Sequence, residues 1–80
     1  MRTMNPEYSK QAESYLDKQT TKQADRIRNA VSQLPAGDVK KLKGIENAYR
    51  LRIGSVRILF ERSGGIVCVV RIDNRGDVYK

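Results

Sequence analysis

The fold of this chain is decided by the stretch Ala48-Tyr49-Arg50-Leu51-Arg52-Ile53-Gly54-Ser55-Val56-Arg57-Ile58-Leu59-Phe60, which has the pattern of two strands joined at a Gly-Ser turn. Successive side chains of a strand point to opposite faces, so the first strand has one face with two arginines and one apolar face. Placing Arg57 beside Arg50 and Arg52 lets the apolar row continue along the second strand. We therefore expect a sheet with three guanidinium groups on one face, an arrangement suited to holding phosphate.

Three strands are expected in the second half of the chain, at about Ala48–Ile53, Ser55–Arg62 and Ile66–Asp73. The short connections Gly54-Ser55 and Ser63-Gly64-Gly65 are typical of hairpins, so these strands should form an antiparallel meander. The preceding segment, Lys40-Lys41-Leu42-Lys43-Gly44, is interpreted as a solvated basic connector that Val39 and Leu42 anchor to the core.

Two helices are expected in the first half. The first runs from about Pro6 to Lys18, with Asn5 as its cap and a proline at its first position. The second begins at the capping box Thr20-Thr21-Lys22-Gln23 and stops at Pro35-Ala36-Gly37. This order of elements predicts an α+β fold, in which an N-terminal helical hairpin packs on one face of a small twisted antiparallel β-sheet of about four strands. Arg2–Met4 is a candidate edge strand, and residues 1–80 form a single domain.

The charge of the chain favours a polyanion or an acidic protein as its partner. The 80 residues contain 16 Lys and Arg against 9 Asp and Glu, which gives a formal net charge of +7. Residues 1–37 have 6 basic and 4 acidic side chains, whereas residues 38–80 have 10 and 5. The second half is therefore expected to carry the binding surface.

Several classes of function are excluded by composition. The chain has one cysteine, Cys68, and no histidine, so an internal disulfide, a Ser-His-Asp triad and a structural zinc site are not expected. Cys68 lies in an apolar strand and is interpreted as a buried residue, not a nucleophile. No apolar run reaches the ~18 residues that span a bilayer, and no signal segment is visible, so the expected location is the cytoplasm.

The ordered motifs of the second half resemble those of the RelE/ParE superfamily of toxins from type II toxin–antitoxin systems. They are Lys40-Lys41-Leu42-Lys43-Gly44, Tyr49-Arg50-Leu51-Arg52-Ile53, Val56-Arg57-Ile58-Leu59-Phe60 and Arg71-Ile72-Asp73-Asn74-Arg75-Gly76-Asp77-Val78-Tyr79. Within the superfamily the chain is most similar to the RelE-type messenger RNA interferases. The resemblance implies a RelE-like fold and a metal-independent endoribonuclease that inhibits translation by cutting messenger RNA at the ribosomal decoding site. It also implies inhibition by a co-encoded antitoxin that is acidic and RelB-like. No membrane partner is implied, and DNA enters only through the antitoxin.

The resemblance also suggests roles for individual residues. Arg57 corresponds to the central strand arginine of the family and would stabilise the charge that develops on phosphorus. Tyr79 corresponds to the C-terminal tyrosine, which would stack on a base, or orient or deprotonate the 2′-hydroxyl. The remaining catalytic candidates are Arg50, Arg52, Asn74 and Arg75, and the RNA-binding candidates are Lys40, Lys41, Lys43, Arg71 and Lys80. No cofactor or metal is expected, since arginine can meet the charge of phosphate.

Two features of the closing motif leave alternatives open. Asn74 stands where many relatives have a histidine, and an asparagine cannot exchange a proton near neutral pH. Asp73 either lowers the net field of the arginines or orients Arg71 or Arg75 through a salt bridge. The other functions compatible with the fold are a ParE-type toxin that blocks DNA gyrase without catalysis, and an inactive relative that retains only antitoxin binding. Clustering of the arginines and Tyr79 in one concavity would favour the nuclease.

Overall fold

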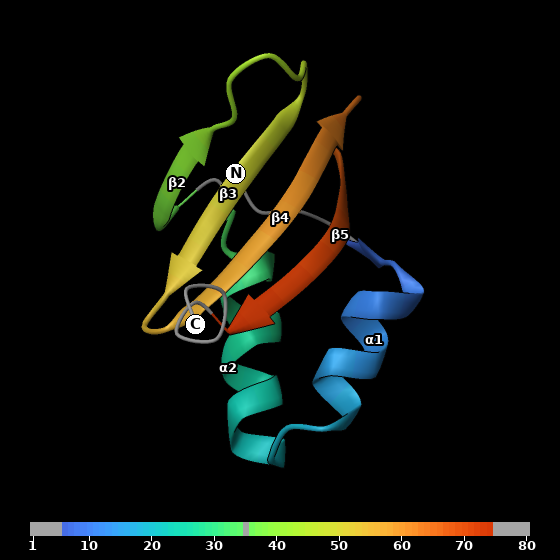
Figure 1. Ribbon diagram of the computed structural model, residues 1–80, viewed down its shortest axis with the longest axis vertical. Helices are drawn as coiled ribbons and strands as arrows, with labels where there is room; N and C mark the ends of the chain where they lie inside the picture. Colours follow the sequence, from blue (N-terminus) through green and yellow to red (C-terminus); the bar gives the residue numbers. More distant parts are fainter. Residues whose placement is uncertain (1–5, 35, 75–80) are drawn as a thin grey trace.

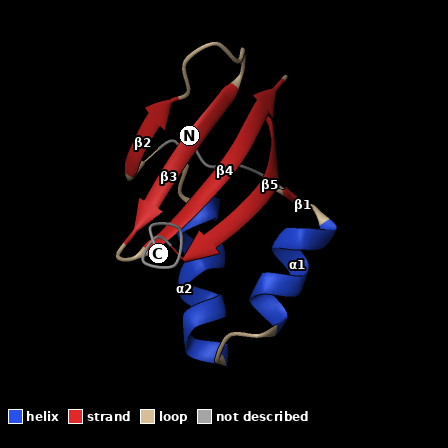
Figure 2. Cartoon of the chain, in the orientation of Figure 1, coloured by secondary structure: helices blue, strands red, loops and turns tan. Residues whose placement is uncertain are grey.

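The computed structural model describes residues 6–34 and 36–74, which form two helices and a five-stranded sheet (Figure 1, Figure 2). In chain order the elements are β1 (Glu7–Tyr8), α1 (Lys10–Asp17), α2 (Thr21–Ser32), β2 (Asp38–Lys41), β3 (Ala48–Ile53), β4 (Val56–Ser63) and β5 (Ile66–Asn74). Across the sheet the order is β1-β5-β4-β3-β2. The predicted α+β class is therefore confirmed.

The three strands predicted in the second half are confirmed as β3, β4 and β5. β3 has the predicted bounds, β4 is shifted by one residue at both ends, and β5 extends one residue further than predicted. The last residue of each strand pairs with the first of the next, so both hairpins close through two-residue turns. In the second turn, Gly64 and Gly65 have φ angles of 57° and 82°, a conformation that glycine adopts without steric cost.

The first helix is shorter than predicted, because a strand occupies its expected start. β1 pairs in parallel with Cys68 and Val69 of β5, so a strand precedes the helices and the sheet is mixed instead of antiparallel. Helix α1 follows Ser9, whose hydroxyl accepts a hydrogen bond from the N–H of Ala12 (3.1 Å). This hydroxyl supplies the N-cap that the sequence analysis assigned to Asn5.

The side chain of Gln11 continues the edge pairing beyond β1. Just after β1, the N–H of Ser9 donates to the carbonyl oxygen of Val69 (2.8 Å), and its hydroxyl donates to that of Val70 (2.6 Å). Further along, Gln11 Nε2 donates to the carbonyl oxygen of Ile72 (3.0 Å), and Gln11 Oε1 accepts from the N–H of Ile72 (2.9 Å). This amide makes the two hydrogen bonds that a residue of a neighbouring strand would make, and it protects the edge of β5.

A further strand, β2, lies where the sequence predicts a solvated connector. Its residues pair antiparallel with β3, from Asp38 opposite Arg52 to Lys41 opposite Tyr49. Val39 packs against the core as predicted. The candidate edge strand Arg2–Met4 and the candidate cap Asn5 lie outside the described residues.

Both helices lie on one side of the sheet, and the upper end of α2 passes behind the sheet in Figure 1. We call the sheet face that packs on the helices the inner face and the opposite one the outer face. Thr20 caps α2 as predicted, since its hydroxyl accepts the N–H of Gln23 (3.2 Å). The core combines the helices with the inner face: Ala12, Leu16, Ile27, Val31, Leu34, Leu51, Val56, Ile58, Phe60, Val67, Val69 and Ile72.

Two expectations about single segments have different outcomes. Cys68 is half-buried, not fully buried. It pairs with Glu61, an exposed residue of β4, and so lies on the outer face of the sheet, away from the helices. Neither helix within the described part of the chain is long and apolar enough to cross a membrane.

Candidate functional site

The outer face of the sheet carries the three arginines identified in the sequence. Arg52 pairs directly with Arg57 across β3 and β4, and Arg50 pairs with Leu59 further along the same face. The residues that alternate with them, such as Leu51, belong to the buried core. The predicted common face of the three arginines is therefore confirmed.

These arginines are partly enclosed. Arg50 is only 9% exposed, and the side chain of Arg57 is 26% exposed. Among the described residues, Nη1 of Arg50, Nε of Arg52 and Nε of Arg57 are buried and have no hydrogen-bond partner. A buried donor without a partner costs about 1–3 kcal/mol, and a charged one costs more. The outer face thus combines positive charge with unused N–H donors, which is what a bound oxyanion requires.

A β-bulge in β5 adds two charged residues to this face. In the pairing of β4 with β5 the register shifts between Leu59 and Phe60, and Val70 is the extra residue. A regular strand would alternate on from Val69 and turn Arg71 and Asp73 toward the core. Because of the bulge they lie on the outer face, while the isoleucine between them stays buried.

Asp73 lies between two arginines. Nε of Arg71 donates to both of its carboxylate oxygens, at 3.1 Å and 3.0 Å. Nη2 of Arg57, its cross-strand partner, lies 3.8 Å from Oδ2, too far for a hydrogen bond. Both roles considered for Asp73 are thus present, since it pairs with Arg71 and also lowers the field at Arg57. At the other edge, Asp38 Oδ1 lies 3.8 Å from Nη2 of Arg50, a pair that the sequence analysis missed.

The three predicted RNA-binding lysines do not share one surface. Lys40 pairs with Arg50 and lies on the outer face, whereas Lys41 pairs with Tyr49 and lies on the inner side at the sheet edge. Lys43 follows β2 in the loop that leads to β3, and all three lysines are exposed. Only Lys40 is therefore placed to extend the arginine surface within the sheet.

The remaining predicted residues lie at or beyond the end of β5. Asn74 pairs with Val56, a core residue, and so falls on the inner side instead of beside Arg57. The other three candidates lie outside the described residues: Arg75, Tyr79 and Lys80. The three arginines thus share one face of the sheet. Their clustering with Tyr79 in one concavity stays a prediction.

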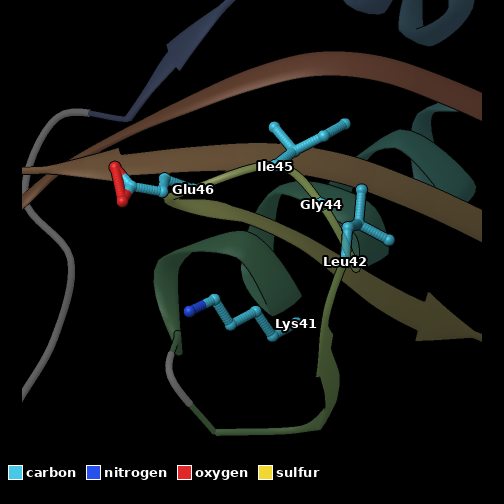
Figure 3. A pocket seen from close by; sticks show the side chains of 5 residues that line it. All are labelled: Lys41, Leu42, Gly44, Ile45 and Glu46. Carbon is cyan, nitrogen blue, oxygen red and sulfur yellow. The ribbon is translucent and has the colours of Figure 1, made fainter.

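The other end of the outer face is apolar. A hollow of about 140 Å³ is lined by Leu42, Ile45, Ala48, Leu59, Phe60, Glu61 and Val70. Ile45 is 54% exposed and Val70 is 41% exposed. A second hollow, of about 290 Å³, lies at the loop between β2 and β3, where Figure 3 shows Lys41 extending away from Leu42 and Ile45. The sequence analysis did not identify this apolar end, although an isoleucine in a polar loop was its signal.

Comparisons with known proteins agree with this fold. No family model matches the chain. A segment of 42 residues, 52% of the chain, is 40% identical to Toxin RelE3 of Methanocaldococcus jannaschii and spans 48% of that protein. The chain thus covers about half the length of this curated relative.

Solved structures match over nearly the whole chain. The RelB-RelE antitoxin-toxin complex from Methanococcus jannaschii matches with a TM-score of 0.70 and 28% identity, over 91% of this chain and 94% of that one. The archaeal RelE-RelB complex from Pyrococcus horikoshii OT3 matches with a TM-score of 0.73 and 22% identity, over 92% and 97% of the two chains. The chain thus has the α+β fold of these RelE chains. The predicted resemblance of the chain to RelE-type toxins is confirmed by these matches.

Proposed function

We propose that this chain is the toxin of a toxin–antitoxin module and that it cuts messenger RNA in the decoding site of the ribosome. The observation that carries the proposal is the cross-strand pair Arg52–Arg57, with buried guanidinium nitrogens that have no partner among the described residues. A phosphate of the RNA backbone supplies both the negative charge and the acceptor oxygens that these nitrogens lack.

Cleavage by the neighbouring 2′-hydroxyl makes specific demands on a site. The 2′-oxygen loses its proton and attacks phosphorus, the P–O5′ bond breaks, and the leaving 5′-oxygen takes up a proton. The products are a 2′,3′-cyclic phosphate and a 5′-hydroxyl. Negative charge accumulates on the non-bridging oxygens in the transition state, so fixed cations that face these oxygens lower the barrier. The proposal requires no cofactor, because guanidinium groups supply this charge.

Arg57 is the residue best placed for the electrostatic role. It lies on β4 between Arg52 on β3 and Asp73 on β5, and its fork of N–H groups matches two phosphate oxygens. In this proposal Arg50 and Arg52 hold the flanking phosphates. Arginine stays protonated and cannot act as a base, so the proton transfers are assigned to Tyr79, following the family resemblance.

The proposed partner is a RelB-like antitoxin with an acidic, amphipathic segment. The outer face offers arginines at one end and the exposed apolar residues Ile45 and Val70 at the other, so one such segment can satisfy both ends. Both archaeal structures described above are complexes of a RelE with a RelB, which supports this choice.

The test is single-turnover cleavage of messenger RNA on programmed ribosomes, with mapping of the RNA ends. The wild-type chain should cut in the decoding site and leave a cyclic phosphate, and prior addition of the antitoxin should abolish the cut. Arg57→Ala should slow cleavage by about 10²-fold or more and change ribosome affinity little, because removing one charge-stabilising donor typically has this effect. Arg62→Ala is the matched control, since Arg62 is an exposed arginine at the far end of the same strand.

Two results would contradict the nuclease. The first is a wild-type chain that stops growth without cutting any message while Arg57→Ala remains equally toxic. The second is equal loss of cleavage in Arg57→Ala and Arg62→Ala, which would indicate a general charge effect. In the first case, inhibition of gyrase supercoiling by the purified chain would identify the ParE-type activity instead.

A further inference from the structure

We propose that Asp73 is an internal competitor for the anion site of Arg57: its carboxylate occupies one side of the guanidinium until a phosphate displaces it. The inference rests on the proposed function only in the choice of RNA as the anion. It concerns regulation of the site by the chain itself, and it does not depend on whether the bound RNA is cut.

The position of Asp73 is set by the backbone. Asp73 lies directly opposite Arg57 in the pairing of β4 with β5, and the bulge at Val70 turns both Asp73 and Arg71 toward the outer face. The side chain of Asp73 is only 17% exposed, so the carboxylate is kept near the arginines instead of extending into solvent. Any anion that approaches Arg57 from the β5 side therefore meets this charge first.

The contacts of Asp73 are unequal. Its two oxygens accept hydrogen bonds from Nε of Arg71 at 3.1 Å and 3.0 Å, whereas the nearest nitrogen of Arg57 is 3.8 Å away. Asp73 thus lowers the field at Arg57 without satisfying its donors, and Nε of Arg57 stays buried and unpartnered among the described residues. A phosphate that makes real hydrogen bonds to Arg57 has an advantage over this long contact.

Displacement of Asp73 requires little rearrangement. The side chain of Arg71 is 56% exposed, so the Arg71–Asp73 pair can turn toward solvent by side-chain rotation while the backbone pairing of β5 is kept. A phosphate beside an unmoved Asp73 would experience repulsion between like charges at a partly buried site, where screening by water is incomplete. We therefore expect the carboxylate to weaken the binding of every phosphate at this position.

The alternative is that Asp73 holds Arg57 in the correct orientation and so strengthens binding. The two roles predict opposite effects of removing the charge. Asp73→Asn keeps the size of the side chain and an oxygen that can accept from Arg71, but it removes the negative charge. Glu61→Gln is the matched control, because it makes the same change of charge on the same face, at the end of β4 away from Arg57.

The experiment measures the binding of a short single-stranded RNA, made uncleavable by 2′-deoxy substitution, to the full chain without ribosomes. Asp73→Asn should bind about tenfold more tightly than wild type at low salt, with Glu61→Gln within about twofold of wild type. The plot of log K against log salt should also steepen by about 0.7, the value for one more phosphate contact to a single strand. Asp73→Ser removes the same charge with a smaller side chain and should show the same tighter binding. It replaces Asp73→Asn in the experiment if that variant does not fold.

The inference is overturned if both Asp73 variants bind as weakly as wild type or more weakly, or if Glu61→Gln gains as much as they do. Its outcome is separate from that of the proposed function. Tighter binding by Asp73→Asn in a chain that never cuts messenger RNA supports the competitor and refutes the nuclease. If Asp73→Asn binds RNA no more tightly than wild type and the wild-type chain does cut messenger RNA, the nuclease is supported and the competitor is refuted.

Discussion

The amide of Gln11 provides a quantitative test of how helix α1 is joined to the sheet. It makes two hydrogen bonds with the backbone of Ile72, at 3.0 Å and 2.9 Å, and Ile72 is fully buried. In the variant Gln11→Ala, the N–H and the carbonyl oxygen of Ile72 both lose this partner. No other hydrogen bond is altered among those described for this edge.

The expected loss of stability follows from these two bonds. At about 1 kcal/mol net for each hydrogen bond, with some further cost for orphaned groups, the free energy of unfolding should fall by about 2–3 kcal/mol. Alanine has a slightly higher helix propensity than glutamine, which offsets only a few tenths of a kcal/mol of this loss. For a domain of this size, about 4–8 °C of Tm corresponds to each kcal/mol, so we expect Tm to fall by about 10–20 °C.

Thermal and urea unfolding followed by circular dichroism measure the effect, with Lys10→Ala, an exposed change in the same helical turn, as the control. A second variant, Gln11→Glu, adds a dependence on pH. Its carboxylate can accept from the N–H of Ile72 but cannot donate to the carbonyl oxygen, so the charged form is disfavoured and the pKa should rise in the folded state. Protonation restores the donor. The stability of Gln11→Glu relative to wild type should thus be highest below about pH 4.3 and be lost as pH rises through the raised pKa.

A Gln11→Ala variant that unfolds at the temperature of Lys10→Ala would refute this account of the sheet edge. So would a Gln11→Glu variant whose deficit is the same at low and at neutral pH. In the first case water would replace the amide without loss of stability. In the second case the carbonyl oxygen of Ile72 would not depend on the donor that Gln11 supplies.

Two other changes test the same end of the fold. Ser9→Ala removes the cap of α1 and the hydrogen bond to the carbonyl of Val70, and should lower the free energy of unfolding by about 1–2 kcal/mol in urea titrations, whereas Ser9→Thr should restore most of it. Burial raises the pKa of the Tyr8 phenol above its usual value, and the nearby guanidinium of Arg28 opposes the shift. Because the folded pKa is the higher one, stability should decline as pH rises above about 10, and Tyr8→Phe should make this decline shallower; equal declines would contradict the shift.

Local pattern was enough to predict the centre of the sheet. From Tyr49 to Ile58 the apolar residues of β3 and β4 alternate with arginines on either side of the first turn, and glycines mark both turns. Both the strands and their register therefore follow from neighbouring residues. The common face of Arg52 and Arg57 is a direct result of that register. The arginine part of the candidate site was therefore accessible from sequence.

The edges were not accessible, because they depend on distant contacts. β1 has two residues, too few for any periodicity, and exists through its pairing with Cys68 and Val69. β2 contains a single partly buried apolar residue, Val39, and reads as a charged loop without its partner β3. A prediction from local composition favours a helix start in the first case and a solvated connector in the second.

The bulge is the third feature that local pattern did not reveal. Val67 and Val69 point to the core with one residue between them, whereas two residues separate Val69 from the next core residue, Ile72. The sequence alone does not say which of these two residues is the extra one of a bulge. For this reason the contact of Asp73 with Arg57 was only one of the alternatives considered. This contact depends on the position at which the register of β5 against β4 shifts by one residue.

The pairing of β1 with β5 also has a consequence for the order in which a newly made chain folds. The helices and β1 are synthesised first, but the edge to which Gln11 attaches is 61 residues further along. Contacts between such distant segments form late, and until then the apolar stripes of α1 and α2 lack the part of the sheet that β5 supplies. The carboxylate opposite Arg57 also arrives with β5. The nascent chain therefore acquires the last of its described strands and the negative charge beside Arg57 at the same time.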